Sequence, residues 1–109
     1  MIKKSVETET LLVTGGGQRI GRAICLAMAK DGWQVAVHFN SSLVEANKVV
    51  DEITSSGNVA LAVQADLANE VAVTSLIATI SNKLTPVTAV INNASIFEED
   101  TVENVTKGS

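Results

Sequence analysis

Short apolar runs alternate with amphipathic stretches along this chain of 109 residues, and this alternation constrains the fold more than any other feature. The apolar runs predict strands over residues 10–14, 35–39, 59–63 and 87–91. Between them, apolar residues recur at helical spacing and predict three helices, the second of which is marked by Leu43, Ala46, Val50 and Ile53. The helices are expected to end at Gly32, at Gly57 and before Pro86, because glycine caps helices and proline interrupts them.

The order of these elements indicates a sheet topology. Two parallel strands need a crossover connection of about a dozen residues or more, and each predicted connection is long enough to supply one. The pattern β-α-β-α-β-α-β therefore predicts an α/β fold, with a parallel sheet and helices on both faces. Right-handed crossovers give the strand order 3-2-1-4, which is a partial, doubly wound sheet of the Rossmann type.

The composition disfavours several classes of function. Apolar residues make up 46% of the chain and charged residues 18%, which is typical of a globular domain. The net charge of −4 disfavours a nucleic-acid partner. The only cysteine, Cys25, cannot form an internal disulfide, and the sequence has neither a signal-peptide pattern nor about 20 consecutive apolar residues. We therefore expect a cytoplasmic protein without a membrane partner, in which Cys25 is a core residue.

A glycine-rich segment from Thr14 to Gly21 follows the first predicted strand and opens the first predicted helix. Free N–H groups and the positive end of the helix dipole attract a pyrophosphate at such a position. Glycine allows a close approach of the backbone and a positive φ, and Gly21 would let the helix pack tightly on the strand. A plain glycine-rich turn is the alternative, but the strand before it and the helix after it favour a dinucleotide site.

The end of the second predicted strand indicates which dinucleotide binds. An acidic residue there holds the ribose 2′-OH of NAD, whereas this chain continues with Asn40, Ser41 and Ser42. Since no carboxylate repels a 2′-phosphate, we expect NADP as the cofactor. Arg19 stands at a helix start, where a cation opposes the dipole, so it is a candidate phosphate ligand rather than a solvated residue. His38 is either a cofactor contact or a structural histidine of the strand.

Polar or aromatic residues also follow the third and fourth predicted strands. The Asp66 carboxylate is a candidate acceptor for the adenine amino group, with a helix N-cap as the alternative. Asn92 and Asn93 offer amides that tie neighbouring loops together and line the crevice. Phe97 either stacks on a flat heterocycle or packs at the start of a following helix.

These motifs resemble the short-chain dehydrogenase/reductases over nearly the whole chain. The family loop is usually Thr-Gly-x-x-x-Gly-x-Gly, and Arg19 at its sixth position is similar to the pteridine reductase branch. Residues 38–42 resemble the 2′-phosphate segment of that branch, and Ser95 stands where most of the family has the glycine of Asn-Asn-Ala-Gly. The resemblance implies that Ser95 and Phe97 line a pterin pocket. It also implies cofactor contacts by Gly15, Gln18, Arg19, Ile20, Gly21, His38, Asn40, Ser41, Ser42, Asp66, Leu67, Asn93, Ala94 and Ser95.

The activity implied by the resemblance is an NADPH-dependent reduction of a small-molecule substrate. Hydride would pass to a C=N or C=O bond, of a pterin by one interpretation and of a 3-oxoacyl or other carbonyl compound by another. Residues 1–109 would form one incomplete NADP-binding Rossmann domain, and a full-length form is expected to be a homo-oligomer.

The family's catalytic tyrosine, and the lysine that follows it at Tyr-x-x-x-Lys, have no counterpart here, because the sequence contains no tyrosine. No catalytic residue and no metal site is assigned, and the chain alone is expected to be inactive. A non-catalytic dinucleotide-binding module and a non-functional shortened product are the alternatives. Without a fifth strand, residues 87–91 would present an unpaired apolar edge, so marginal stability or pairing with another chain is expected.

Overall fold

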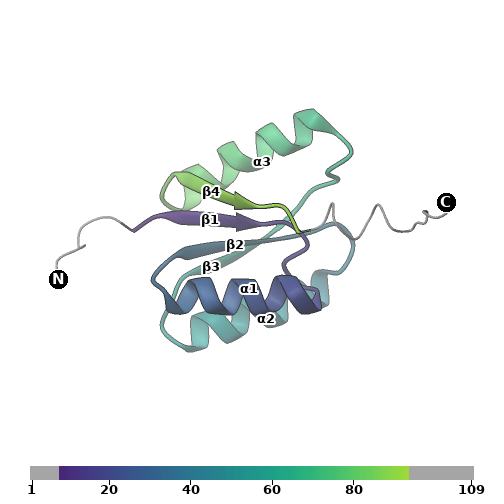
Figure 1. Cartoon of the computed structure of the whole chain (residues 1–109). Helices are drawn as coiled ribbons and strands as arrows, with labels where there is room; N and C mark the ends of the chain where they lie inside the picture. The colour runs from purple at the N-terminus through teal and green to yellow at the C-terminus, as the bar shows by residue number, and fades with distance from the viewer. Residues whose placement is uncertain (1–7, 94–109) are drawn as a thin grey trace.

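A four-stranded sheet with helices on both faces makes up residues 8–93, the part of the chain that the computed structural model describes (Figure 1). Strands and helices alternate in the predicted order. Their bounds are β1 (Thr10–Val13), α1 (Arg19–Lys30), β2 (Gln34–Phe39), α2 (Leu43–Ser55), β3 (Ala60–Gln64), α3 (Glu70–Lys83) and β4 (Val87–Ile91).

The sheet has the order β3-β2-β1-β4, and all three strand pairs are parallel. Strand β1 lies in the interior, where Leu12 is paired with Ala36 of β2 on one side and with Val90 of β4 on the other. Because the strands are parallel, their carboxyl ends meet at one edge of the sheet. The predicted strand order 3-2-1-4 and the partial Rossmann-type fold are confirmed.

The hydrophobic core consists of two clusters, one on each face of the sheet, because successive side chains of a strand point to opposite faces. The cluster under α1 and α2 includes Leu11, Val13, Val35 and Val37. The cluster under α3 includes Leu12, Ala36, Leu76 and Ile80. Figure 1 shows α1 and α2 together below the sheet and α3 above it. No helix in this described part combines the length and the apolar character that crossing a bilayer requires.

The buried side of α2 differs from the predicted apolar stripe. Ala46 and Ile53 are buried as expected, but the third fully buried residue is Val49, whereas Val50 is half-buried and Leu43 is 49% exposed. Leu43 is the first residue of the helix and is not among the described residues that pack into the cluster beneath it. The position of the helix over the sheet therefore selects the buried residues, and hydrophobicity alone does not.

All three predicted helix ends agree with the structure, including the end of α3 at Lys83, before Pro86, whereas the proposed cap at the start of α3 does not. Gly32 follows α1 with φ of 100° and Gly57 follows α2 with φ of 91°, a conformation that glycine adopts readily. At the start of α3, the Asn69 side chain accepts hydrogen bonds from the N–H groups of the second and third helical residues, at 2.9 and 3.2 Å. The hypothesis that Asp66 caps this helix is wrong, because Asp66 lies too far before the first turn.

Candidate nucleotide-binding site

Four polar segments come together at the edge of the sheet where the strands end. Residues 14–18 connect β1 to α1, residues 40–42 connect β2 to α2, residues 65–69 connect β3 to α3, and Asn92 and Asn93 follow β4. In open parallel sheets, ligands bind at this edge, beside the point where the strand order reverses. Here that point lies between β1 and β4, so the candidate site is built around the loop after β1.

Gly15 forms the sharp turn after β1, with φ of 63°. Its amide N–H donates to Nδ1 of His38 at 3.0 Å, and its C=O accepts from the Asn93 side-chain amide at 3.1 Å. The N–H of Gly16 donates to the C=O of His38 at 2.9 Å. Because both N–H groups have acceptors within the protein, Gly15 and Gly16 shape the loop. A phosphate would have to be bound further along it.

The start of α1 offers amide N–H groups that can bind an anion. Among residues 8–93, no acceptor is recorded for the N–H of Gly17, Arg19 or Ile20, whereas the Gln18 N–H donates to the C=O of Gly15 at 3.3 Å. The Gln18 side chain does not cap the helix, and the first turn contains no acidic residue. Unpaired N–H groups and the positive end of the helix dipole make this helix start attractive to phosphate.

Three glycines lie where any side chain would collide with a neighbour. A Cβ on Gly16 would lie 2.9 Å from a side-chain carbon of β2, and a Cβ on Gly17 would lie 2.8 Å from the backbone N of Ala46. A Cβ on Gly21 would overlap the C=O of Gly15. Gly21 therefore permits the tight packing of α1 on the loop that the sequence predicts. The contact between Gly17 and Ala46 places the loop against the first turn of α2.

Residues 40–42 present polar groups beside this loop. Asn40 and Ser41 are exposed, and the C=O of Asn40 accepts a hydrogen bond from the Gln64 side chain at 3.1 Å. Ser42 is the N-cap of α2, but its hydroxyl makes no capping hydrogen bond. The segment thus has hydroxyl and amide groups that a phosphate can engage, and it contains no carboxylate.

Two arginines of α1 differ in their partners. Arg22 donates two hydrogen bonds to Glu52 of α2, at 3.0 and 2.6 Å, and these raise the pKa of Arg22 and lower the pKa of Glu52. Arg19 is exposed, and the described part of the chain places no carboxylate against it. The neighbouring Gln18 and Ile20 are exposed as well, Ile20 to 54%. Arg19 is therefore the arginine that is available to a ligand.

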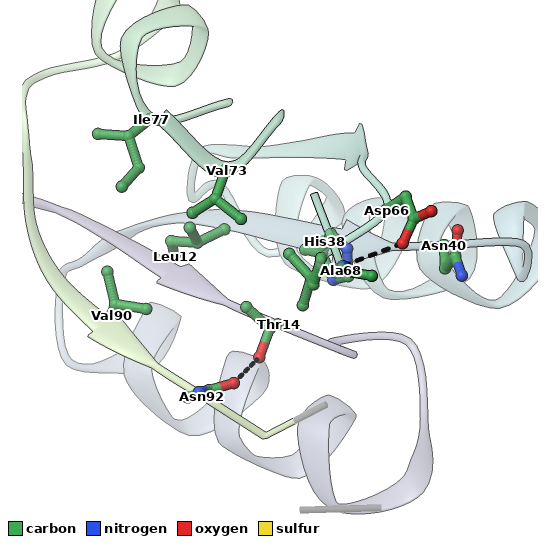
Figure 2. A pocket seen from close by; sticks show the side chains of 11 residues that line it. Leu12, Thr14, His38, Asn40, Asp66, Ala68, Val73, Ile77, Val90 and Asn92 are labelled. Atoms are coloured by element: carbon green, nitrogen blue, oxygen red, sulfur yellow. Dashed lines mark hydrogen bonds between the residues drawn. The ribbon is translucent and has the colours of Figure 1, made fainter. Parts of the chain in front are cut away.

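A cavity of about 480 Å³ opens on the α3 side of the same edge (Figure 2). Its apolar wall consists of Leu12, Val73, Ile77 and Val90, and its other lining residues are Thr14, His38, Asn40, Asp66, Leu67, Ala68 and Asn92. One carboxylate oxygen of Asp66 accepts from the N–H of Ala68 at 3.0 Å. Within residues 8–93 the second oxygen has no recorded partner, so it can accept a hydrogen bond from a ligand.

Three polar side chains of the site are buried: Thr14 is 5% exposed, His38 1% and Asn93 2%. His38 uses Nδ1 for Gly15, and its Nε2 lies 2.8 Å from the C=O of Ala65. These contacts support the structural alternative for His38. The sequence did not predict these two hydrogen bonds. The available signal was a histidine at the end of an otherwise apolar strand, because a buried imidazole needs hydrogen-bond partners.

The two asparagines after β4 connect this strand to β1, as the sequence suggests. The Thr14 hydroxyl donates to the Asn92 side-chain oxygen at 3.1 Å, which Figure 2 marks with a dashed line, and Asn93 reaches Gly15. The remaining predicted contacts, Ala94, Ser95 and Phe97, lie outside the described residues.

Cys25 lies beneath the loop, where its thiol donates a weak hydrogen bond to the C=O of Gly16 at 3.8 Å. Burial raises the pKa of this thiol to about 12. Since only the thiolate is a good nucleophile, Cys25 is a core residue and not a reactive group.

Residues 9–108 match the family model of the short chain dehydrogenases. The chain is 42% identical over 96 residues to the uncharacterized oxidoreductase YgfF of Escherichia coli (strain K12), and 39% identical over 95 residues to a 3-oxoacyl-[acyl-carrier-protein] reductase of Synechocystis sp.. Both matches cover 87% of this chain but only 39% and 38% of the relative, so the chain spans about two fifths of their length. The short-chain dehydrogenase/reductase homolog YusS of Bacillus subtilis is 40% identical over 92 residues, with 84% of both proteins covered.

Solved structures show the same likeness. FolM alternative dihydrofolate reductase 1 from Brucella suis, crystallised with NADP, superposes with a TM-score of 0.75 at 41% identity. The match covers 83% of this chain and 37% of that one. The protein of the same name from Brucella canis, also complexed with NADP, gives a TM-score of 0.75 at 37% identity, over 90% of this chain and 41% of that one. With its sheet order and a family match over nearly every residue, the chain belongs to the short-chain dehydrogenase family.

Proposed function

We propose that this chain forms the NADP-binding part of a short-chain oxidoreductase. The observation that carries the proposal is the helix start at Arg19, whose guanidinium and amides have no partner among residues 8–93, beside the segment after β2, which contains no carboxylate. A negatively charged group fits this position. The 2′-phosphate of NADP can form charge-assisted hydrogen bonds with the Arg19 guanidinium, whereas the neutral 2′-OH of NAD cannot form an ion pair with it. The NADP complexes of the two similar FolM proteins support this choice of nucleotide.

The helix start after the glycine loop, residues 40–42 and Asp66 each have a role in this proposal. The N–H groups of Gly17, Arg19 and Ile20 bind the pyrophosphate, and the Arg19 guanidinium binds the 2′-phosphate together with residues 40–42. The free oxygen of Asp66 accepts from the adenine amino group, beside Leu67 at the rim of the cavity. Once bound, NADPH supplies the hydride for the reduction.

The test is a titration of the chain with NADPH and, separately, with NADH, followed by nucleotide fluorescence. Arg19→Ala is expected to weaken NADPH binding about tenfold to a hundredfold, as for the loss of a charge-assisted hydrogen bond. Binding of NADH is expected to change little, because NADH has no 2′-phosphate.

Arg22→Ala is the matched control, because it removes the same charge one turn further along α1 from a residue already paired with Glu52. It is expected to leave both affinities unchanged. If wild-type chain binds neither nucleotide, or if Arg22→Ala weakens NADPH as much as Arg19→Ala does, the proposal is wrong.

A pterin is the substrate that we propose for the whole enzyme, which reduces a C=N bond. The name of the similar FolM proteins, alternative dihydrofolate reductase, supports a pteridine substrate. A 3-oxoacyl thioester is the second candidate, because several similar relatives are 3-oxoacyl-[acyl-carrier-protein] reductases. Oxidation of NADPH in the presence of a dihydropterin or of an acetoacetyl thioester distinguishes the two.

We propose that the chain by itself binds the nucleotide without turnover, since its sequence contains no tyrosine to act as the family's acid. A non-catalytic dinucleotide-binding module has the same signature and is the alternative. Consumption of NADPH by the chain with either substrate would contradict both. The cytoplasmic location and the homo-oligomer stay predictions.

A further inference from the structure

A chain of hydrogen bonds crosses all four strands at the edge where the nucleotide would bind. The Asn93 amide, after β4, donates to the C=O of Gly15 at 3.1 Å. The N–H of Gly15, after β1, donates to His38 of β2 at 3.0 Å, and the other ring nitrogen of His38 lies 2.8 Å from the C=O of Ala65, after β3. The two side chains in this chain of bonds, Asn93 and His38, are almost completely buried.

The partners of His38 determine the protonation of its ring. The N–H of Gly15 can only donate, so Nδ1 must carry a lone pair. The C=O of Ala65 can only accept, so Nε2 must carry the proton. A neutral imidazole with its proton on Nε2 satisfies both neighbours, whereas the other tautomer and the cation would direct an N–H against the N–H of Gly15.

We infer that His38 is a positioning residue of the nucleotide site, and that its neutral ring fixes the glycine turn from which the phosphate-binding amides follow. The inference rests on the proposed function for the identity of the ligand. Gly15 makes no contact with the phosphates in this arrangement. His38 and Asn93 hold its N–H and C=O, so the turn is fixed before a nucleotide arrives. Beyond the turn, the N–H groups of Gly17, Arg19 and Ile20, which have no acceptor within residues 8–93, are held in place.

The chain carries its own reporters of this arrangement. It contains one histidine and one cysteine. Cys25 is completely buried under the loop, against the C=O of Gly16, so a thiol reagent can reach it only when the structure opens. The Cys25 labelling rate in the absence of nucleotide therefore measures how firmly the loop is held.

The decisive pair of variants is His38→Leu and His38→Asn. Leucine fills the space but accepts no hydrogen bond, so labelling of Cys25 by a disulfide reagent is expected to be about tenfold faster than in wild type. Asparagine is smaller, but its oxygen stands about where Nδ1 stood and can accept from Gly15, so slower labelling than in His38→Leu is expected. Packing alone predicts the opposite order, because asparagine fills the buried site less well than leucine.

Leu76→Ala is the control for a general loss of stability, because Leu76 is buried in the cluster on the other face of the sheet. After correction for the urea midpoints, His38→Leu is expected to label faster than Leu76→Ala. Equal corrected rates, or faster labelling in His38→Asn than in His38→Leu, would overturn the inference. So would a ¹⁵N spectrum of the single histidine that places the ring proton on Nδ1.

The affinities of the variants for NADPH and NADH distinguish a failure of this inference from a failure of the proposed function. His38→Leu is expected to weaken NADPH and NADH by similar factors of about ten, because both share the pyrophosphate, whereas Arg19→Ala affects NADPH selectively. If wild-type chain binds neither nucleotide, the proposed function fails, while the labelling rates still decide whether His38 holds the loop. Unchanged affinities in His38→Leu together with faster labelling would refute the positioning role.

Discussion

Glycines of the loop are needed for different physical reasons. Gly15 has φ of 63°, in a region that side chains other than glycine rarely adopt, and it therefore makes the turn itself. Gly21 is not at a positive φ and lies in the first turns of α1, where alanine would ordinarily favour the helix by about 1 kcal/mol. Its importance lies in the space that it leaves for the backbone of Gly15 and for the Asn93 side chain.

Gly21→Ala is therefore expected to destabilise the protein despite the better helix former. The added Cβ would overlap the C=O of Gly15, and shifting a backbone is costly, so we expect a net loss of about 1–3 kcal/mol in the free energy of unfolding, together with loss of NADPH binding. Urea denaturation and nucleotide fluorescence measure the two effects. Gly57→Ala is the control, because an added Cβ would meet no atom of residues 8–93 within 4 Å; with φ of 91° the variant should cost about 1 kcal/mol and leave binding intact.

Helices α2 and α3 begin with caps of different quality. The Asn69 side chain accepts two backbone hydrogen bonds at the start of α3, at 2.9 and 3.2 Å. Ser42 occupies the equivalent place in α2 and makes no such bond. Asn69 thus caps α3, whereas the Ser42 hydroxyl does not cap α2 and is available for the nucleotide contact that we propose.

The two caps are expected to respond differently to alanine. Asn69→Ala should lower the free energy of unfolding by about 1 kcal/mol and leave the affinity for NADPH unchanged, because Asn69 does not line the cavity. Ser42→Ala should leave the urea midpoint nearly unchanged and weaken NADPH binding. A large loss of stability in Ser42→Ala would mean that its hydroxyl caps α2 in solution.

Stability of the molecule as a whole is linked to pH through Cys25. Burial raises the pKa of this thiol from 9.0 to about 12 in the folded protein. The folded state therefore keeps its proton at a pH where the unfolded chain has lost it. The contribution of the protonated Cys25 thiol to the free energy of unfolding is fully present below about pH 9 and is lost as the pH rises toward 12.

We expect the free energy of unfolding to fall by about 1.4 kcal/mol per pH unit above pH 9 from this group, and thus by about 2 kcal/mol near pH 10.5. Cys25→Ala should lower stability at neutral pH but remove this part of the alkaline slope. Urea denaturation of both proteins between about pH 7 and pH 10.5 measures the difference. The chain contains no tyrosine, so no phenol ionises in this pH range and adds to the measured slope. Parallel slopes in the two proteins would contradict the shifted pKa.

Local signals in the sequence were sufficient for the elements and for their order in the sheet. Apolar runs, helical spacing and the glycines after α1 and α2 each depend on a few neighbouring residues, and the handedness of the crossovers is general. Strand β3 was predicted over residues 59–63, but it spans Ala60–Gln64, because pairing with β2 decides where the strand begins and ends. The glycine loop and the missing carboxylate after β2 were likewise visible in the sequence.

The partners of polar atoms were decided only by the tertiary structure. Gly15 and Asn93 are 78 residues apart, and Gly15 and His38 are 23 apart, yet their hydrogen bonds fix the loop. Sequence patterns did not show that His38 is enclosed or that Asn69 instead of Asp66 caps α3. Nor did they show that, within residues 8–93, Arg22 is paired with a carboxylate and Arg19 is not. Hydrophobic periodicity places a residue on a strand or a helix, but a hydrogen bond depends on the position and direction of two atoms. For distant residues, only the packing of the whole sheet brings such atoms together.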